Sequence, residues 1–505
     1  MFHLVLLTMA IGLLLYWLTQ KPENFPPGPP RWPIIGNILE VLVFSNGKGK
    51  LEVFATISRL YGGIVGLYLG VQPTIIVSDY KLVKELSIND DLCGRPSGNK
   101  DIDKLMYKGK SRCGIIFNHG DDWREQRRFS LRHMRELGFG KMSLEGVIQE
   151  EVEDLLRQVT KKAGADFEHP VELSDLLGVA SINVLWYVVA RERYSHDDAR
   201  VAVLTNLIRS IASRLDGAGS AYSHFPWIMA LLPGTASKFQ DYLDIRERLQ
   251  NFILERIKEH KKTLDKNNPR DFIDVYLAEM QEQQERNKEK TSFHELQLLE
   301  IISDFFIAGF DTTFNSMAFA LIYMVCYPEV QKKSQKEIDT VVGGNRLPSL
   351  SDRSSLPYVE ATIEEIFRTS SVVPLAVPHA VLHASKDVPF HGYTIPKNTR
   401  ILLNLAHMHS DPNLWGDPQN FRPERFLSEE NKVKRPEYLM PFGIGKRQCL
   451  GETLARSNMF MFFTSIMQRF ELSVPSGGKL PDSKDVIGAF TLCPTPYQAK
   501  ITPRL

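Results

Sequence analysis

A single cysteine near the carboxyl end of the chain stands in a setting that favours a thiolate. The stretch PFGIGKRQCLGE (residues 441–452) places Lys446 and Arg447 shortly before Cys449. Cysteine acts as a nucleophile or metal ligand only as its thiolate, which nearby positive charge and a helix N-terminus stabilise. A helical pattern follows directly, and the three glycines of the stretch would let a large flat group approach the backbone. We therefore expect a socket for a bulky group, the alternative being a buried structural cysteine.

A second group of reactive side chains lies in the sequence AGFDTT, residues 308–313. A threonine that bonds back to a helical carbonyl tends to bend the helix, and small residues beside the bend open a groove. Asp311 and Thr312 could relay protons into such a groove. A purely structural polar kink is the alternative.

This group sits inside a long apolar helical pattern that must position it. Ser292 and Glu295 predict a capping box at its start, and Pro328 predicts its end. About 33 residues would then extend about 50 Å. A membrane span is the alternative, but Asp304 and Asp311 would each cost about 3 kcal/mol at the centre of a bilayer. We expect a buried core helix.

The rest of the chain predicts a mainly α fold with small β-sheets. Residues 120–370 carry mostly helical patterning, residues 61–78 read as a hairpin, and 380–405 and 486–502 are strand-like. No repeat and no linker divides residues 38–505, which we take as one large domain.

A Gly/Pro/Ser-bearing stretch at 216–237 interrupts the helical patterning. It could cap a pocket, dip into a bilayer or form a buried loop. Its apolar residues are Phe225, Trp227, Ile228, Met229, Leu231 and Leu232.

The first twenty residues predict a transmembrane anchor. They contain no charged side chain and are long enough to cross a hydrocarbon core of about 30 Å. A cleaved signal peptide fits less well because there is no basic start and no small-residue cleavage site. The first positive charges, Lys21 and Arg31, follow the segment and would leave the body in the cytosol. Residues 21–37 are proline-rich and predict a stiff spacer.

Composition excludes several classes of protein. A formal net charge of +1 gives no reason to expect a nucleic-acid partner. The five cysteines are scattered, which argues against a disulfide framework and against a paired-cysteine zinc site. No G-x-G-x-x-G opens a helix, so we expect no bound dinucleotide.

Several motifs in order along the chain resemble those of the cytochrome P450 family. The stretch 441–452 is similar to the haem-binding loop, F-x-x-G-x-R-x-C-x-G, and AGFDTT to the oxygen-activation motif. Further matches are Glu-x-x-Arg at Glu365 and Arg368, Pro-Glu-Arg-Phe at 423–426, and Trp-x-x-x-Arg at Trp123 and Arg127. The resemblance covers essentially the whole chain, anchor and spacer included.

The resemblance implies haem b, with the Cys449 thiolate as the axial ligand of its iron. Arg447 and the helix dipole would stabilise that thiolate. Thr312 would hydrogen-bond dioxygen or an ordered water, and Asp311 would organise the proton path. Glu365, Arg368 and Arg425 would form a buried structural ion-pair triad. The residues expected to bind the cofactor are Arg95, Trp123, Arg127, His379, Phe442 and Arg447, with a surface or capping role as the alternative at Arg95 and His379.

The reaction implied is monooxygenation of a lipophilic small molecule by O2. Electrons would come from NADPH through the membrane-bound NADPH–cytochrome P450 reductase, with cytochrome b5 as a further donor, at the cytosolic face of the endoplasmic reticulum. Arg124, Arg128, Arg132 and Lys446 could form a basic docking face, or simply a solvated one.

The substrate class rests on similarity and on apolar pocket segments. The family pattern lines the pocket with residues 93–116, 205–235, 305–312, 372–377 and 487–492, which are mostly apolar. Details of the chain resemble microsomal animal members of the steroid- and drug-oxidising group, most closely those of arthropods. This implies either an insect-type hormone, such as a terpenoid or steroid, or a xenobiotic such as an insecticide. The rival classes are a P450-like isomerase or dehydratase and a non-catalytic haem-binding protein.

Overall fold

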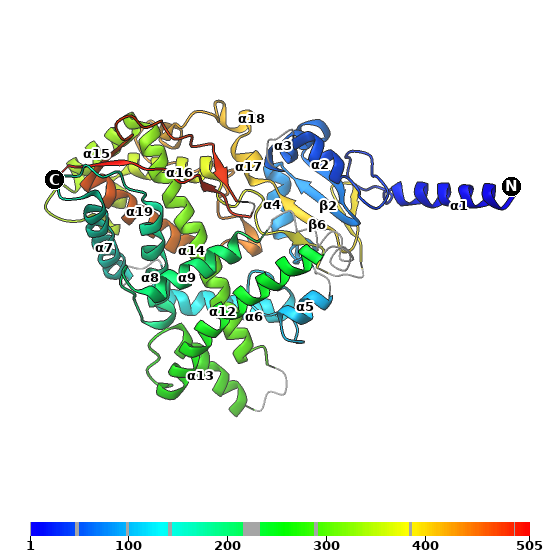
Figure 1. Cartoon of the computed structure of the whole chain (residues 1–505), viewed down its shortest axis with the longest axis horizontal. Coiled ribbons are helices and arrows are strands. Elements are labelled where there is room, and N and C mark those ends of the chain that lie inside the picture. The colour runs from blue at the N-terminus through cyan, green and yellow to red at the C-terminus, as the bar shows by residue number, and fades with distance from the viewer. Residues whose placement is uncertain are drawn as a thin grey trace.

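The computed structural model describes residues 2–45, 50–96, 100–139, 144–215, 233–286, 291–382, 386–488 and 490–504. It is a broad body made mostly of helices, with a four-stranded sheet toward one side and the N-terminal helix projecting away from it (Figure 1). The apolar residues 225–232, expected to cap a pocket or touch a bilayer, lie outside the described residues.

The helices account for most of the described chain. Their bounds are α1 Phe2–Thr19, α2 Ile38–Ser45, α3 Lys50–Tyr61, α4 Tyr80–Ile88, α5 Lys100–Met106, α6 Gly120–Glu136, α7 Glu145–Ala163, α8 Ser174–Ala190, α9 Ala199–Ala212, α12 Pro233–Thr263, α13 Phe272–Glu285, α14 Glu295–Cys326, α15 Pro328–Val341, α16 Pro357–Ser370, α17 Leu405–His409, α18 Pro412–Trp415 and α19 Glu452–Arg469. Short 3-10 turns include η4 Pro423–Phe426 and η5 Gly445–Arg447.

The strands form one four-stranded sheet and three two-stranded ones. Their bounds are β1 Ile64–Leu69, β2 Gln72–Val77, β3 His379–Ala380, β4 Val388–Phe390, β5 Tyr393–Ile395, β6 Arg400–Leu403, β7 Phe470–Ser473, β8 Val486–Ile487, β9 Cys493–Pro494 and β10 Lys500–Pro503. The large sheet has the order β1-β2-β6-β3, and the small ones pair β10 with β7, β4 with β5, and β8 with β9. The antiparallel β1–β2 pair, from Ile64↔Val77 to Leu69↔Gln72, confirms the predicted hairpin. The mainly α fold with small β-sheets is confirmed.

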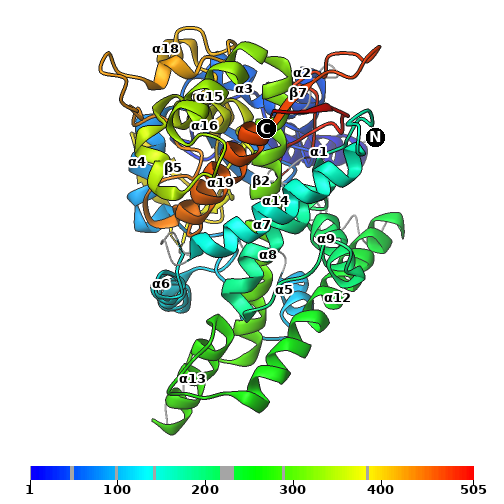
Figure 2. The same ribbon diagram turned by 90° about the vertical axis from the view of Figure 1, so that its left-hand side faces the viewer.

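The long helix α14 is the centre of the helical body. Figures 1 and 2 both show it running through the molecule with other helices around it. Within the described ranges it is the one helix long and apolar enough to cross a membrane, yet 72% of its apolar window is buried inside the protein. The expectation of a buried core helix is confirmed, and the chain leaves the helix one residue before Pro328.

The predicted capping box at the start of α14 is wrong. The N-cap is His294, whose Nδ1 accepts the N–H of Gln297 at 3.1 Å. Glu295 is therefore the first helical residue rather than the third, too early to reach back to the N-cap. Ser292 instead donates its hydroxyl to Glu125 at 2.5 Å and so joins α14 to α6.

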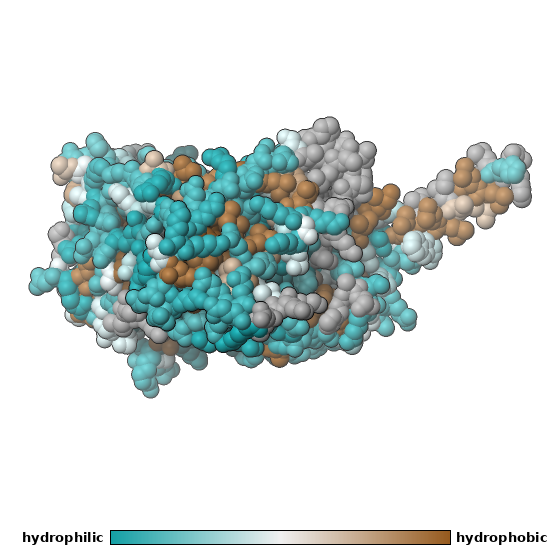
Figure 3. Space-filling model, turned by 90° about the horizontal axis from the view of Figure 1, so that it is seen from below, coloured by the Kyte–Doolittle hydropathy of each residue, from teal (hydrophilic) through white to brown (hydrophobic). Residues whose placement is uncertain are grey.

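Helix α1 presents its large apolar side chains to the outside. Leu13 and Trp17 are 67% and 70% exposed, and Figure 3 shows the helix as an apolar rod beyond the polar surface of the body. The proline-rich segment after it packs on β1, where the Gly66 N–H donates to the Pro27 carbonyl at 2.8 Å. A Cβ on Gly28 would come within 2.2 Å of the Gly66 oxygen, so glycine is required for this close approach.

The predicted ion-pair triad joins α16 to η4. Arg368 donates from Nε and Nη2 to the two oxygens of Glu365, both at 2.7 Å, and Arg425 Nε reaches the same carboxylate at 3.1 Å. The side chains of Glu365 and Arg368 are fully buried, and Arg368 Nη1 also donates to the His409 carbonyl at 2.7 Å. The triad is confirmed as a structural connection.

Candidate functional site

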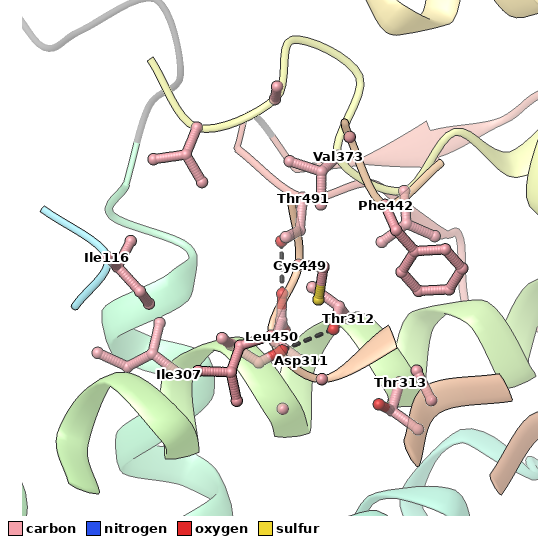
Figure 4. Close-up of a pocket in the computed structure, with 18 of the residues that line it drawn as sticks. Ile116, Ile307, Asp311, Thr312, Thr313, Val373, Phe442, Cys449, Leu450 and Thr491 are labelled. Carbon is pink, nitrogen blue, oxygen red and sulfur yellow. Dashed lines mark hydrogen bonds between the residues drawn. The ribbon is translucent and has the colours of Figure 1, made fainter. Parts of the chain in front are cut away.

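An internal cavity of about 280 Å³ collects the residues that the sequence singled out. Its wall includes α14, the 441–451 loop, α6, the chain around residue 379 and the segment with Phe490 and Thr491 near the carboxyl end. Figure 4 shows Cys449, Asp311, Thr312 and Thr491 converging on this space from separate parts of the chain. Segments far apart in sequence therefore share one chamber.

The loop that carries Cys449 closes on itself. The Cys449 N–H donates to the Phe442 carbonyl at 2.9 Å, and α19 begins at Glu452, three residues after the cysteine. Gly445 has φ +74°, and a Cβ there would lie 2.3 Å from the Ser87 carbonyl oxygen. This glycine is needed for contact with the end of α4, whereas the sequence pattern had suggested approach by a bound group.

The Cys449 sulfur faces the cavity. All five cysteines belong to the described part of the chain, and Cys449 alone among them lines this chamber. Burial raises the pKa of its thiol, while the N–H groups of Gly451 and Glu452 and the charge of Arg127 lower it. The predicted helix N-terminus is present, and Arg127, which was not expected to act on the sulfur, lowers the pKa of the thiol by its charge.

Arg447 is held on three sides by protein. Its Nε donates to the Cys93 carbonyl and its Nη1 to the Asn118 carbonyl, both at 2.9 Å. Its guanidinium carbon lies 3.5 Å from the centre of the Trp123 ring. Arg127, one turn after Trp123 on α6, donates to the Gln448 carbonyl. These contacts join α6 to the cysteine loop.

Arg95 is a second fixed cation on the same wall. It is buried, and it donates from Nε to the Ile116 carbonyl at 2.7 Å and from Nη1 to the Val377 and Pro378 carbonyls at 3.0 Å. Burial lowers the pKa of both Arg95 and Arg447, and their mutual repulsion adds to the effect on Arg447. No carboxylate among the described residues pairs with either arginine. The two positive charges on this wall therefore have no negatively charged partner in the described protein.

Buried donors without partners mark the same place. Trp123 Nε1 and both ring nitrogens of His379 reach no partner with hydrogen-bond geometry within the described chain. Burial first, then Arg95 and Arg447, hold the pKa of His379 well below its usual value, so the ring is neutral. A buried arginine, Arg95, a partly buried one, Arg447, and orphaned N–H donors beside a cavity suit the carboxylates of a haem. The donor set therefore fits the implied cofactor.

Phe442 lies on the cavity wall close to α16. Its ring meets that of Phe367 edge to face at 5.1 Å, and Arg456 of α19 lies 4.9 Å above it. These contacts fix the ring between α16 and α19, with its remaining surface toward the chamber.

Thr312 and Asp311 form the opposite part of the chamber. The Thr312 hydroxyl donates to the Ala308 carbonyl at 2.6 Å, which is the expected back-bond to the helix. Asp311 accepts from Thr491 at 2.5 Å and from Asn315 at 3.2 Å. Burial raises the pKa of Asp311, while Thr491 and the positive charge of Arg209 lower it. Sequence reasoning missed Thr491 because nothing in the apolar stretch around it marks a partner 180 residues away.

Asp304 is a second buried carboxyl that sequence reasoning did not place in the site. It lines the cavity and accepts the N–H groups of Ile115 and Ile116 at 2.6 and 2.9 Å. Burial raises the pKa of Asp304 to about 7. The sequence offered one signal, a charged residue within an otherwise apolar helix. Its role is to hold the 113–116 segment against α14.

The rest of the lining is mainly apolar, as the family pattern implied. Within the described residues, each of the five expected segments contributes to the wall, and α8 adds side chains that were not foreseen. The contributors include Ile115, Ile116, Leu185, Ala212, Leu215, Phe305, Ile307, Val372, Val373 and Phe490.

The expected basic face is partly neutralised. Arg124 pairs with Asp121 at 2.7 Å, Arg132 with Glu136 at 3.3 Å, and Lys446 with Asp90 at 2.5 Å. Arg128 is exposed. Docking of an acidic partner on this face stays a prediction.

Comparison with known proteins gives one consistent result. The family model described as Cytochrome P450 matches residues 26–501. Cytochrome P450 2J5 of Mus musculus is 35% identical, with 100% of this chain and 97% of that protein covered. Cytochrome P450 2C5 of Oryctolagus cuniculus is 37% identical, with 99% of each covered, and Cytochrome P450 2U1 of Homo sapiens is 34% identical, with 97% and 91% covered.

Proposed function

Because the chain belongs to the cytochrome P450 family and is a haem-thiolate monooxygenase of small molecules, we propose that its substrate is lipophilic and its electrons come from NADPH through NADPH–cytochrome P450 reductase. The reaction would be RH + O2 + NADPH + H⁺ → ROH + H2O + NADP⁺. The printed sequence contains no G-x-G-x-x-G that opens a helix, which supports a separate protein as the electron donor.

The observation that carries the site assignment is the position of one sulfur. Members of the family bind haem b through a cysteine thiolate, and Cys449 is the cysteine on the wall of the chamber. We assign it as the axial ligand. When bound, the haem supplies the iron at which O2 is reduced and one oxygen atom is passed to the substrate.

The residues of the chain prepare and protect that chemistry. Arg95, Arg447 and the Trp123 and His379 donors would hold the two carboxylates of the cofactor, and Phe442 would pack against its ring. The mainly apolar part of the wall would limit access of water to the reacting atoms. On the other side, the Asp311 carboxyl would take a proton from solvent and release it into the chamber beside the Thr312 hydroxyl.

The lining supports a lipophilic substrate. Aliphatic and aromatic side chains dominate the wall. Two buried acids also line it, but both already accept hydrogen bonds: Asp304 from two backbone N–H groups, and Asp311 from Thr491 and Asn315. The substrate would thus be held by apolar contact rather than by a charge pair. We propose an insect-type hormone, such as a terpenoid or steroid, or a xenobiotic such as an insecticide.

The location we propose is the endoplasmic reticulum membrane, with the catalytic domain (38–505) on the cytosolic face. Helix α1 with its exposed apolar surface would be the anchor (1–20), and residues 21–37 the spacer. Lys21 and Arg31 lie just after the apolar run, in agreement with the tendency of positive charge to stay cytosolic. Cytochrome b5 is proposed as a further electron donor.

The decisive experiment combines the purified full chain, reductase and NADPH with a panel of terpenoids, steroids and insecticides under ¹⁸O2. We expect an NADPH-dependent product that carries one ¹⁸O atom. Product formed without NADPH would point instead to an isomerase or dehydratase. A haem-loaded protein that turns over none of the panel in the presence of competent reductase would contradict the proposed substrate class.

A further inference from the structure

The Asp311 carboxyl is held by a residue from the far end of the chain. Thr491 Oγ1 donates to Asp311 Oδ2 at 2.5 Å, and Asn315, one turn later on α14, donates to the same oxygen at 3.2 Å (Figure 4). Asp311 and Thr491 both line the chamber, and they are only 7% and 9% exposed. A buried bond of this kind to a charged acceptor is strong and directional.

Thr491 lies in the turn of a small surface hairpin. Strand β8 pairs with β9 through Val486↔Pro494 and Ile487↔Cys493, and the described residues between them, 488 and 490–492, are here called the tip. Gly488 shapes this tip with φ +109°, and a Cβ there would come within 2.0 Å of the Thr491 carbonyl oxygen. The outer strand is exposed, with Ile487 at 52%. The hairpin thus has an exposed outer strand, while Thr491 and Leu492 at its tip are buried.

Among the described residues, two hydrogen bonds attach this tip to the body. The Leu492 N–H donates to the Val372 carbonyl at 2.8 Å, and the Thr491 hydroxyl makes the bond to Asp311. Between the glycine and these bonds stands Phe490, which lines the chamber where a substrate would lie. Movement of the tip would therefore shift Phe490, which forms part of the apolar wall, together with Thr491, which is the hydrogen-bond partner of Asp311.

The electrostatic surroundings of Asp311 make that partner important. The charged or titratable groups that face it are Arg209 from α9 and the Cys493 thiol from β9. Burial raises the pKa of Cys493 to about 11, so this thiol is neutral. The stabilisation of a charged Asp311 is then left mainly to Thr491, Arg209 and Asn315.

This inference rests on the proposed proton-transfer role of Asp311. We propose that Thr491 is a positioning residue whose hydrogen bond fixes the Asp311 carboxyl, so that substrate contact at the hairpin tip controls proton delivery into the chamber. The proton enters and leaves at the Asp311 carboxyl, and Thr491 neither gains nor loses one. When the tip is displaced, the Asp311 carboxyl keeps only the Asn315 donor and is less well fixed. The side reaction NADPH + H⁺ + O2 → NADP⁺ + H2O2 then competes with product formation.

The test compares Thr491→Val, which keeps the shape but removes the donor, with Thr491→Ser, which keeps the donor. In the reductase assay we expect Thr491→Val to lower the ratio of product to NADPH consumed about tenfold, with a matching rise in hydrogen peroxide. Thr491→Ser should restore most of the ratio. In an Asp311→Asn background, Thr491→Val should add no further loss, because the two residues act as one unit. An equal loss in both backgrounds would overturn the proposal.

A second readout does not depend on turnover. Amide hydrogen exchange of the 486–495 hairpin, measured on the haem-loaded protein without NADPH, should rise in both Thr491→Val and Asp311→Leu, which removes the acceptor, and stay low in Thr491→Ser. Unchanged exchange in the first two variants would show that the bond does not hold the tip. If the wild type yields no NADPH-dependent product, the proposed function fails, while the exchange measurement still decides whether Asp311 and Thr491 are coupled.

Discussion

The guanidinium carbon of Arg447 lies over Trp123, 3.5 Å from the centre of the indole ring, while two of its nitrogens donate to the Cys93 and Asn118 carbonyls. Three separate segments therefore fix one cation beside the chamber. An arginine immobilised in this way loses little side-chain entropy when it binds an anion. We call Arg447 with Trp123, Cys93 and Asn118 the cradle; its geometry is already fixed before an anion binds.

Trp123→Phe tests the unpartnered indole donor in this cradle. The substitution keeps a ring under Arg447 and removes Nε1, which has no partner in the described protein. We expect haem to transfer to a scavenging apoprotein about tenfold faster, because one hydrogen bond to a carboxylate is lost. Trp415→Phe is the control, since its indole donates to the Met408 carbonyl instead. Equal transfer rates for Trp123→Phe and wild type would show that the Trp123 Nε1 donor does not help to bind the haem carboxylates.

Cys449→Ala should abolish the absorption band near 450 nm of the reduced, carbon monoxide-bound protein. Cys493→Ala is the matched control, because that thiol does not line the chamber and burial raises its pKa to about 11. Its band should be retained at full intensity. Retention of the band in Cys449→Ala, in a folded and haem-loaded protein, would exclude Cys449 as the ligand.

Arg368→Met should destabilise the fold by about 3 to 5 kcal/mol, because it leaves the fully buried Glu365 carboxylate with only one cationic partner. Urea unfolding followed by circular dichroism measures the change. Arg422→Ala, which removes a half-exposed partner of Asp417, should cost less than about 1 kcal/mol. Similar midpoints for the two variants would mean that the triad is not a structural connection.

Asp304 should give stability a pH dependence. Its pKa is raised by burial to about 7 in the folded protein, well above that of an unfolded aspartate. The folded state therefore holds the proton more tightly, and this contribution is lost as pH rises through about 7, with a slope of up to about 1.4 kcal/mol per pH unit.

Asp304→Asn should flatten the decline of stability between roughly pH 4 and 7, because the amide oxygen can still accept the Ile115 and Ile116 N–H groups but does not titrate. Urea unfolding at several pH values measures this. Asp339→Asn, at an exposed ion pair with Arg504, is the control. A variant with the same pH slope as the wild type would refute the raised pKa.

Removal of residues 2–20 should release the protein from membranes without loss of the 450 nm band. The reason is that α1 projects from the body and presents exposed apolar side chains to the outside. Sedimentation with microsomes, with and without high salt, measures the release. A truncated chain that still sediments quantitatively would show that another surface anchors it.

The sequence by itself determined the elements and the chemistry of their side chains. Periodicity identified α14, and its two aspartates ruled out a membrane span; turn residues identified the β1–β2 hairpin. Cys449 between cations and a helix start already indicated a thiolate. These features are local, since each depends on residues within a few positions of one another.

Tertiary structure decided which residues contact one another at the site and at the helix ends. It brought the charge of Arg127 to the Cys449 sulfur and Thr491 to Asp311 across 180 residues, and it used Asp304 to hold the 115–116 backbone. It also moved the cap of α14 to His294, because Ser292 was taken by Glu125 on α6. Such contacts depend on how helices and loops pack in space, which no spacing in the sequence specifies.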